Sequence, residues 1–182
     1  MALLADLRVL YHLVLKPVRG TSHADRMESF YSGQAEAYDD FRKRLLKGRQ
    51  ELYDQLEVRD GDVWVEMGGG TGSNLEYLGD RINRLSKVYV VDLSESLLEV
   101  AARRANERGW TNVETVAADA TTWQPDGGAD TVTFSYSLTM VPDWFGAIEN
   151  AKRMLKPDAQ LGVVDFYVSR KYPLENLQKH NW

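Results

Sequence analysis

The chain has 182 residues, a net charge of −5 and no cysteine. This length fits one domain with a substantial core, the absent cysteines exclude disulfides and thiolate metal sites, and the acidic balance argues against binding of bulk nucleic acid. No apolar run reaches the ~18–20 residues that span a bilayer, and the histidines lie far apart, so we expect no metal centre and an intracellular protein, either cytoplasmic or peripherally attached to a membrane.

Residues 1–50 are predicted to form N-terminal helices and a lid, and they carry nine Lys/Arg against six Asp/Glu. Helical stretches are expected at 3–14, 24–38 and 39–56. The first is amphipathic and basic, so residues 1–19 could lie on a membrane surface. Docking of this helix against the domain or a partner remains open as the alternative.

Residues 51–182 alternate between apolar runs and helical patterns. Strands are predicted at Val63–Met67, Val88–Val91, Val113–Ala117, Thr131–Phe134 and Leu161–Phe166. Helices are predicted at Ser73–Leu85, Glu95–Arg108 and Asp143–Leu155. This alternation is typical of an α/β fold with a mostly parallel, Rossmann-like sheet. Ligands of such sheets bind at the carboxyl ends of the strands, where the strand order reverses.

A glycine loop follows the first predicted strand. Its frame is E-x-G-x-G-x-G, through Glu66, Gly68, Gly70 and Gly72. The dinucleotide fingerprint G-x-G-x-x-G/A fails here because its last position is Ser73. The second strand ends in an acid twenty residues after the loop, where a carboxylate can accept both hydroxyls of a ribose. The layout therefore indicates an adenosine-containing ligand other than a dinucleotide.

This frame resembles the first motif of class I methyltransferases, which bind S-adenosyl-L-methionine. By that resemblance the loop holds the amino-acid tail of the cofactor, Glu66 binds near its ammonium, and Asp92 binds the ribose. The alternatives from the residues themselves are a Glu66 that caps the loop and an Asp92 that caps the next helix.

The same resemblance extends to the third and fourth strands. Asp119 and Ala120 would contact the adenine, Leu93 would pack on the purine, and Ser135 and Tyr136 would lie beside the transferred methyl group. Asp119 could also be an ordinary turn residue, and Tyr136 a partly buried core residue. Methyl transfer from a sulfonium depends on positioning and desolvation, so we expect neither a Ser-His-Asp nor a metal constellation.

The strings YDDFRKRLLKGR, beginning at Tyr38, and WVEMGGGTGSNLEYLGDRI, beginning at Trp64, resemble the methyltransferase domain of betaine-lipid synthases. That resemblance implies N-methylation of the amine of diacylglycerylhomoserine. It implies that Tyr31 and Tyr38 line the cofactor tail and the amine pocket, and that Arg42 or Arg49 pairs with the homoserine carboxylate. The alternatives are that Tyr31 and Tyr38 pack the lid against the core, and that the basic run is a solvated helix face.

Methyltransferase sheets of this class finish with a sixth and an antiparallel seventh strand, and residues 168–182 show no strand pattern. We therefore expect these C-terminal strands to be missing, with a fused or partner synthase domain as one explanation. The rival functions are a methyltransferase of a quinone or other small metabolite, and an inactive cofactor-binding scaffold. A carbon acceptor needs a base, and neither Phe30–Arg49 nor Ser135–Met140 contains a histidine.

Overall fold

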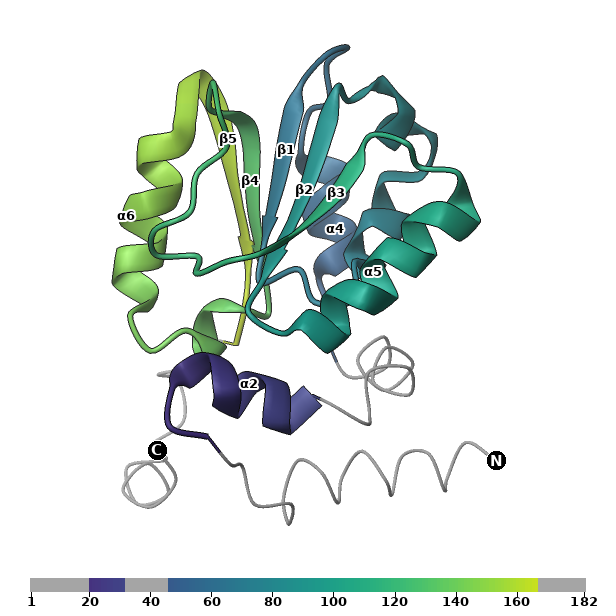
Figure 1. Cartoon of the computed structure of the whole chain (residues 1–182). Coiled ribbons are helices and arrows are strands. Elements are labelled where there is room, and N and C mark those ends of the chain that lie inside the picture. The colour runs from purple at the N-terminus through teal and green to yellow at the C-terminus, as the bar shows by residue number, and fades with distance from the viewer. Residues whose placement is uncertain (1–19, 32–45, 167–182) are drawn as a thin grey trace.

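Five parallel strands form one sheet in the order β3–β2–β1–β4–β5 in the computed structural model, which describes residues 20–31 and 46–166 (Figure 1). The strands are β1 (Val63–Met67), β2 (Lys87–Asp92), β3 (Val113–Ala117), β4 (Ala129–Ser135) and β5 (Leu155–Val164). Every neighbouring pair is parallel. The order reverses between β1 and β4, which creates the crevice where such sheets bind ligands. The predicted Rossmann-like α/β class is confirmed.

Helices cover both faces of this sheet. They are α2 (His23–Tyr31), α4 (Arg49–Gln55), the 3₁₀ helix η1 (Ser73–Arg84), α5 (Glu95–Arg108), the short 3₁₀ helix η2 (Leu138–Met140) and α6 (Trp144–Met154). The helices α4, η1 and α5 pack on one face, and α6 packs on the other. Helix α2 lies across the carboxyl ends of the strands (Figure 1). Within the part of the chain that the structure describes, no helix is long and apolar enough to cross a membrane.

Several predicted boundaries differ from those observed. The helix predicted over 39–56 begins at Arg49 in the described residues, because Gly48 has a φ of 82° and cannot continue a right-handed helix. The region Ser73–Arg84 is 3₁₀ rather than α-helical, and it is kinked at Gly79. The predicted helix 3–14 and the segment 167–182 lie outside the described residues.

Strand β5 also begins earlier than predicted, at Leu155 rather than Leu161. It pairs with β4 from Ala129 onward, and the register shifts between Ala129 and Thr131. Asp158, within this strand, has a φ of 59°. The strand therefore accommodates a left-handed residue as an irregularity of its pairing.

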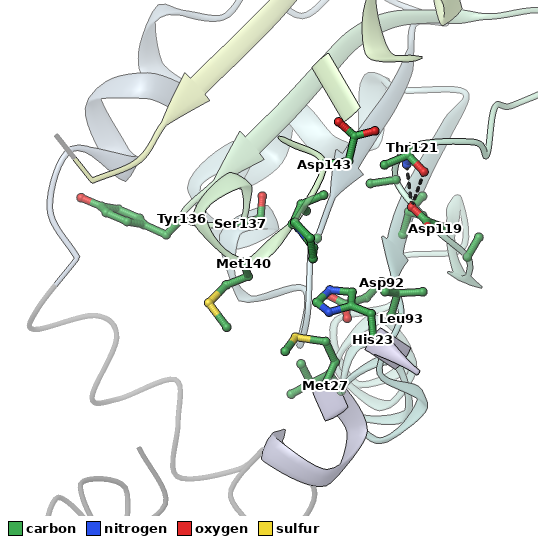
Figure 2. A pocket seen from close by; sticks show the side chains of 17 residues that line it. His23, Met27, Asp92, Leu93, Asp119, Thr121, Tyr136, Ser137, Met140 and Asp143 are labelled. Carbon is green, nitrogen blue, oxygen red and sulfur yellow. Dashed lines mark hydrogen bonds between the residues drawn. The ribbon is translucent and has the colours of Figure 1, made fainter. Parts of the chain in front are cut away.

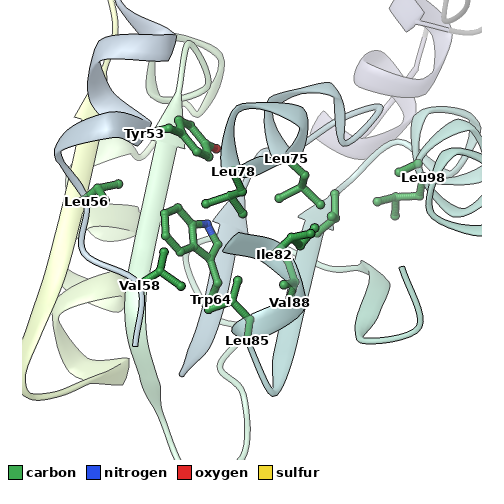
Figure 3. Packing of buried hydrophobic residues seen from close by; sticks show 12 residues of the cluster. Tyr53, Leu56, Val58, Trp64, Leu75, Leu78, Ile82, Leu85, Val88 and Leu98 are labelled. Atoms are coloured by element: carbon green, nitrogen blue, oxygen red, sulfur yellow. The ribbon is translucent and has the colours of Figure 1, made fainter. Parts of the chain in front are cut away.

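The larger of the two core clusters lies between the sheet and the helices α4, η1 and α5. Trp64 of β1 is fully buried there, and Figure 3 shows its indole among side chains of these elements. The ring stacks on Tyr53 with the two centroids 5.5 Å apart. Its Nε1 donates a hydrogen bond of 3.1 Å to the Thr133 hydroxyl, so the buried polar atom of the indole is satisfied.

Trp64→Ala removes this ring and leaves a cavity that the rigid sheet cannot close. We expect it to lower the free energy of unfolding by about 3–5 kcal/mol. Leu161→Ala is the control, because Leu161 is 39% exposed on β5. Chemical denaturation of both variants tests the assignment; an equal effect of the two substitutions would contradict it.

Candidate functional site

One pocket opens between the carboxyl ends of the strands and α2. Figure 2 shows side chains that reach it from α2, from the strand-end loops and from the loop before α6. Its lining includes Gly68, Asp92, Leu93, Asp119, Ala120 and Tyr136, all of which the sequence singled out. Chain segments far apart in sequence thus meet at the crevice that the strand order creates.

Two carboxylates at one end of the pocket are held by their own loops. Asp92, at the end of β2, accepts hydrogen bonds of 2.9 Å from the backbone N–H groups of Gly70 and Ser94. Asp119, after β3, accepts two hydrogen bonds of 2.8 Å from the backbone and hydroxyl of Thr121. The apolar side chain of Leu93 also lines this end. Two fixed acceptors beside an apolar wall suit a ribose and a flat base.

The glycine loop packs too closely for side chains. Gly68 has a φ of 63°, and a Cβ at this position would lie 2.5 Å from the Cβ of Ser137. Gly72 has a φ of 67°, and a Cβ there would approach the Cβ of Ala101 to 3.3 Å. Gly70 also has a positive φ. The loop therefore needs these glycines to reach its shape, and Gly68 lines the pocket directly.

Glu66 lies beneath the loop, fully buried, and is absent from the pocket lining. Its carboxylate accepts hydrogen bonds of 2.8 Å from the Asn74 amide and the Thr133 hydroxyl, and a further bond from the Tyr53 hydroxyl. Burial and the adjacent carboxylate raise the pKa of Tyr53 well above its usual value, so the phenol stays protonated and donates. This environment favours a Glu66 that supports the loop over one that contacts a ligand.

Arg49 belongs to the same buried group. Only 2% of its surface is exposed, and its guanidinium donates a hydrogen bond of 3.0 Å to the Asn74 side-chain oxygen. The guanidinium also lies 5.7 Å from the centroid of the Tyr77 ring. Arg49 does not line the pocket, so in this structure it faces the loop support rather than an acceptor.

The opposite wall of the pocket follows β4. Tyr136 lines it with a φ of 55°, an uncommon backbone conformation for a residue other than glycine. Its hydroxyl donates a hydrogen bond of 2.6 Å to the Lys47 carbonyl, and its ring packs against Phe166. Ser135 is buried and does not line the pocket, whereas Ser137 does.

Sequence reasoning missed several lining residues, above all His23 and Met27 of α2. Figure 2 shows the His23 imidazole reaching the pocket from α2. Asp143, the N-cap of α6, also lines the pocket and accepts from the Gly146 N–H. His23 directly precedes the helical stretch predicted at 24–38, but nothing in the sequence placed its side chain at the pocket.

The remaining candidates cannot be placed at the pocket. Tyr31 is the last residue of α2, and Tyr38, Arg42 and residues 1–19 lie outside the described residues. Among residues 20–31 and 46–166, no three His, Cys, Asp or Glu side chains gather as a metal site would require.

Comparisons with known proteins agree with this geometry. The family model described as the ubiE/COQ5 methyltransferase family matches residues 23–178. A demethylmenaquinone methyltransferase of Geobacillus stearothermophilus is 30% identical over 138 residues, which are 75% of this chain and 55% of that protein. The ubiquinone/menaquinone biosynthesis C-methyltransferase UbiE of Pseudomonas fluorescens is 28% identical over 169 residues, 89% of this chain and 66% of that protein. The chain thus spans between half and two thirds of these relatives.

Among solved structures, a methyltransferase of Geobacter sulfurreducens in complex with S-adenosyl-L-homocysteine has a similar fold. The TM-score is 0.59 at 21% identity, over 71% of this chain and 51% of that one.

Tyr53→Phe removes one donor from the buried Glu66 carboxylate. We expect the free energy of unfolding to fall by about 1–3 kcal/mol, because a buried charge loses a hydrogen bond. Tyr77→Phe is the matched control, since the Tyr77 ring packs nearby but is only half-buried. Thermal and chemical unfolding measure both; a Tyr53 variant as stable as the control would show that Glu66 does not depend on this phenol.

Proposed function

Because the chain belongs to the ubiE/COQ5 methyltransferase family, we propose that it binds S-adenosyl-L-methionine and transfers its methyl group to a small acceptor. The observation that carries the proposal is the pair of fixed carboxylates, Asp92 and Asp119, at the ends of adjacent strands beside the glycine loop. The cofactor supplies a methyl group on a positively charged sulfur. The residues of this chain bind it, orient it and exclude water.

The donor set fits each part of the cofactor. Asp92 is placed to accept from the ribose hydroxyls, because its carboxylate lies at the pocket and is held in position by two backbone N–H groups. Asp119 and the backbone of Ala120 suit the polar edge of adenine, and Leu93 suits its face. Gly68 has no side chain and lines the pocket with its backbone, which suits the amino-acid tail.

For the acceptor we propose the ring carbon of a hydrophobic quinol. The relatives with this activity support it, and so do apolar side chains of the pocket lining, those of Met27, Met140, Val141 and Pro142. A quinol carbon becomes nucleophilic when a ring hydroxyl loses its proton, which requires a base. His23 lines the pocket and is the natural candidate for that base.

His23 therefore removes the objection that the sequence raised against a carbon acceptor. That objection rested on the absence of a histidine from two segments, and His23 lies outside both. The proton taken from the quinol hydroxyl passes to the imidazole. After the ring carbon has gained the methyl group, the ring hydrogen at that carbon leaves as a proton and aromaticity returns.

A second candidate acceptor is the amine of a lipid-linked homoserine. The specific observation in its favour is the string from Tyr38 to Arg49, together with the loop string, which resembles betaine-lipid synthases. A homoserine carboxylate needs a cationic partner. No Lys or Arg lines the pocket in the described residues, so the geometry gives this candidate less support than the quinol.

To separate the two candidate acceptors, the chain is incubated with methyl-labelled S-adenosyl-L-methionine and two dispersed acceptors, demethylmenaquinol and diacylglycerylhomoserine. The label in each acceptor is then measured. Label in the quinol alone supports the first proposal, and label in the lipid alone overturns it in favour of the second. Cofactor binding without label in either acceptor supports an inactive scaffold.

Asp92→Asn tests the ribose assignment. We expect the Kd for S-adenosyl-L-homocysteine to rise about tenfold or more, because a charged acceptor of hydroxyl hydrogen bonds is lost. Calorimetry measures the Kd, and the unfolding midpoint checks that the loop which Asp92 holds through Gly70 survives. Unchanged affinity in a folded variant would show that Asp92 does not hold the ribose.

His23→Gln tests the base. We expect quinol methylation at saturating cofactor to fall about 100-fold, the lower end of the range for general base catalysis, while affinity for S-adenosyl-L-homocysteine stays close to that of the unmodified chain. Arg26→Gln is the control on the same helix, because Arg26 is exposed and does not line the pocket. Full activity of the His23 variant would exclude this histidine as the base.

A further inference from the structure

Helix α2 contributes His23 and Met27 to the pocket, yet it is separated from the strands in sequence. Within the described residues, Glu28 of this helix makes polar contacts with the sheet domain. The Glu28 carboxylate accepts a hydrogen bond of 2.8 Å from the Ser94 hydroxyl and a longer one of 3.3 Å from the Ser96 backbone N–H. These contacts join α2 to the beginning of α5.

The beginning of α5 is a favourable place for a carboxylate. Ser94 is the N-cap of this helix, and its hydroxyl oxygen accepts from the Leu97 N–H while its proton goes to Glu28. The free N–H groups of a first helical turn carry a partial positive charge, which a carboxylate stabilises. Glu28 thus extends the cap of α5 from another part of the chain.

The pKa of Glu28 agrees with a charged contact. Partial burial alone raises the pKa of this carboxyl, but the hydrogen bonds from Ser94 and Ser96 outweigh burial and the net shift is downward. The side chain is therefore ionised at neutral pH, which strengthens both hydrogen bonds.

The position of this contact relates it to the cofactor. Ser94 lies two residues after Asp92, and its backbone N–H donates to the Asp92 carboxylate. Glu28 therefore fastens α2 directly beside the proposed ribose acid. On the same helix, His23 and Met27 line the pocket from the side of α2 (Figure 2).

We propose that Glu28 is a positioning residue that fastens α2 over the adenosine end of the pocket, so that α2 retains the bound cofactor and holds His23 at the acceptor. This inference rests on the proposed function for the identity of the ligand. The contact itself, between Glu28 and the N-terminus of α5, does not.

The test compares Glu28→Gln with Glu95→Gln in the full chain. Glu95 is an exposed acid in the first turn of α5. Its substitution removes one negative charge, as Glu28→Gln does, but no described side-chain hydrogen bond joins Glu95 to α2. Four quantities are measured: the rate of S-adenosyl-L-homocysteine dissociation, the hydrogen exchange of amides 23–31 without ligand, the exchange of β1 amides, and the unfolding midpoint.

We expect Glu28→Gln to speed dissociation about tenfold and to raise exchange in α2, because a charge-assisted hydrogen bond is replaced by a neutral one. The unfolding midpoint and the exchange of β1 amides stay unchanged, which a general loss of stability would not produce. Glu95→Gln alters neither dissociation nor exchange in α2.

If Glu28→Gln had the same dissociation rate and the same α2 exchange as the unmodified chain, the proposed role of Glu28 would be overturned. Failure of the unmodified chain to bind S-adenosyl-L-homocysteine would instead overturn the proposed function. In that case the exchange of α2 without ligand still decides whether Glu28 fastens the helix.

Discussion

A single buried carboxylate, that of Glu66, constrains much of this structure. An ionised group without solvent is stable only when hydrogen bonds surround it, and three elements supply donors: Tyr53 from α4, Asn74 from η1 and Thr133 from β4. Arg49 completes the group through Asn74. Because each donor must be in place at once, the helix before the sheet, the helix after the loop and the central strand pair are positioned relative to one another.

This arrangement determines the shape of the pocket. With Glu66 fixed below, the glycine loop rises between β1 and η1, and its Gly70 N–H meets the carboxylate of Asp92 on the neighbouring strand. Ser137 closes the other side by packing against Gly68 and donating to the Met67 carbonyl. The ligand-facing groups are therefore held by bonds within the protein, which reduces the ordering that ligand binding requires.

Helix α2 contributes two side chains to the pocket from a segment that precedes the sheet in sequence. It brings an imidazole and a thioether to a pocket whose other lining residues follow the ends of the strands, and Glu28 connects it to the first turn of α5. The balance between a carbon and an amine acceptor depends on this helix, because His23 is the candidate base. The same pocket without His23 would suit an acceptor that needs no deprotonation by the protein.

Local sequence patterns were enough to predict the parallel α/β class, the glycine loop and the positions of Asp92 and Asp119 at strand ends. These features depend on periodicity, on glycine conformation and on the rule that parallel strands end at one edge. The sequence could not decide which side chains meet from distant segments. Only the tertiary structure turned Glu66 and Arg49 into a buried support and brought His23 to the pocket. The direction of those side chains depends on packing between elements that are far apart in the chain, and no local pattern encodes it.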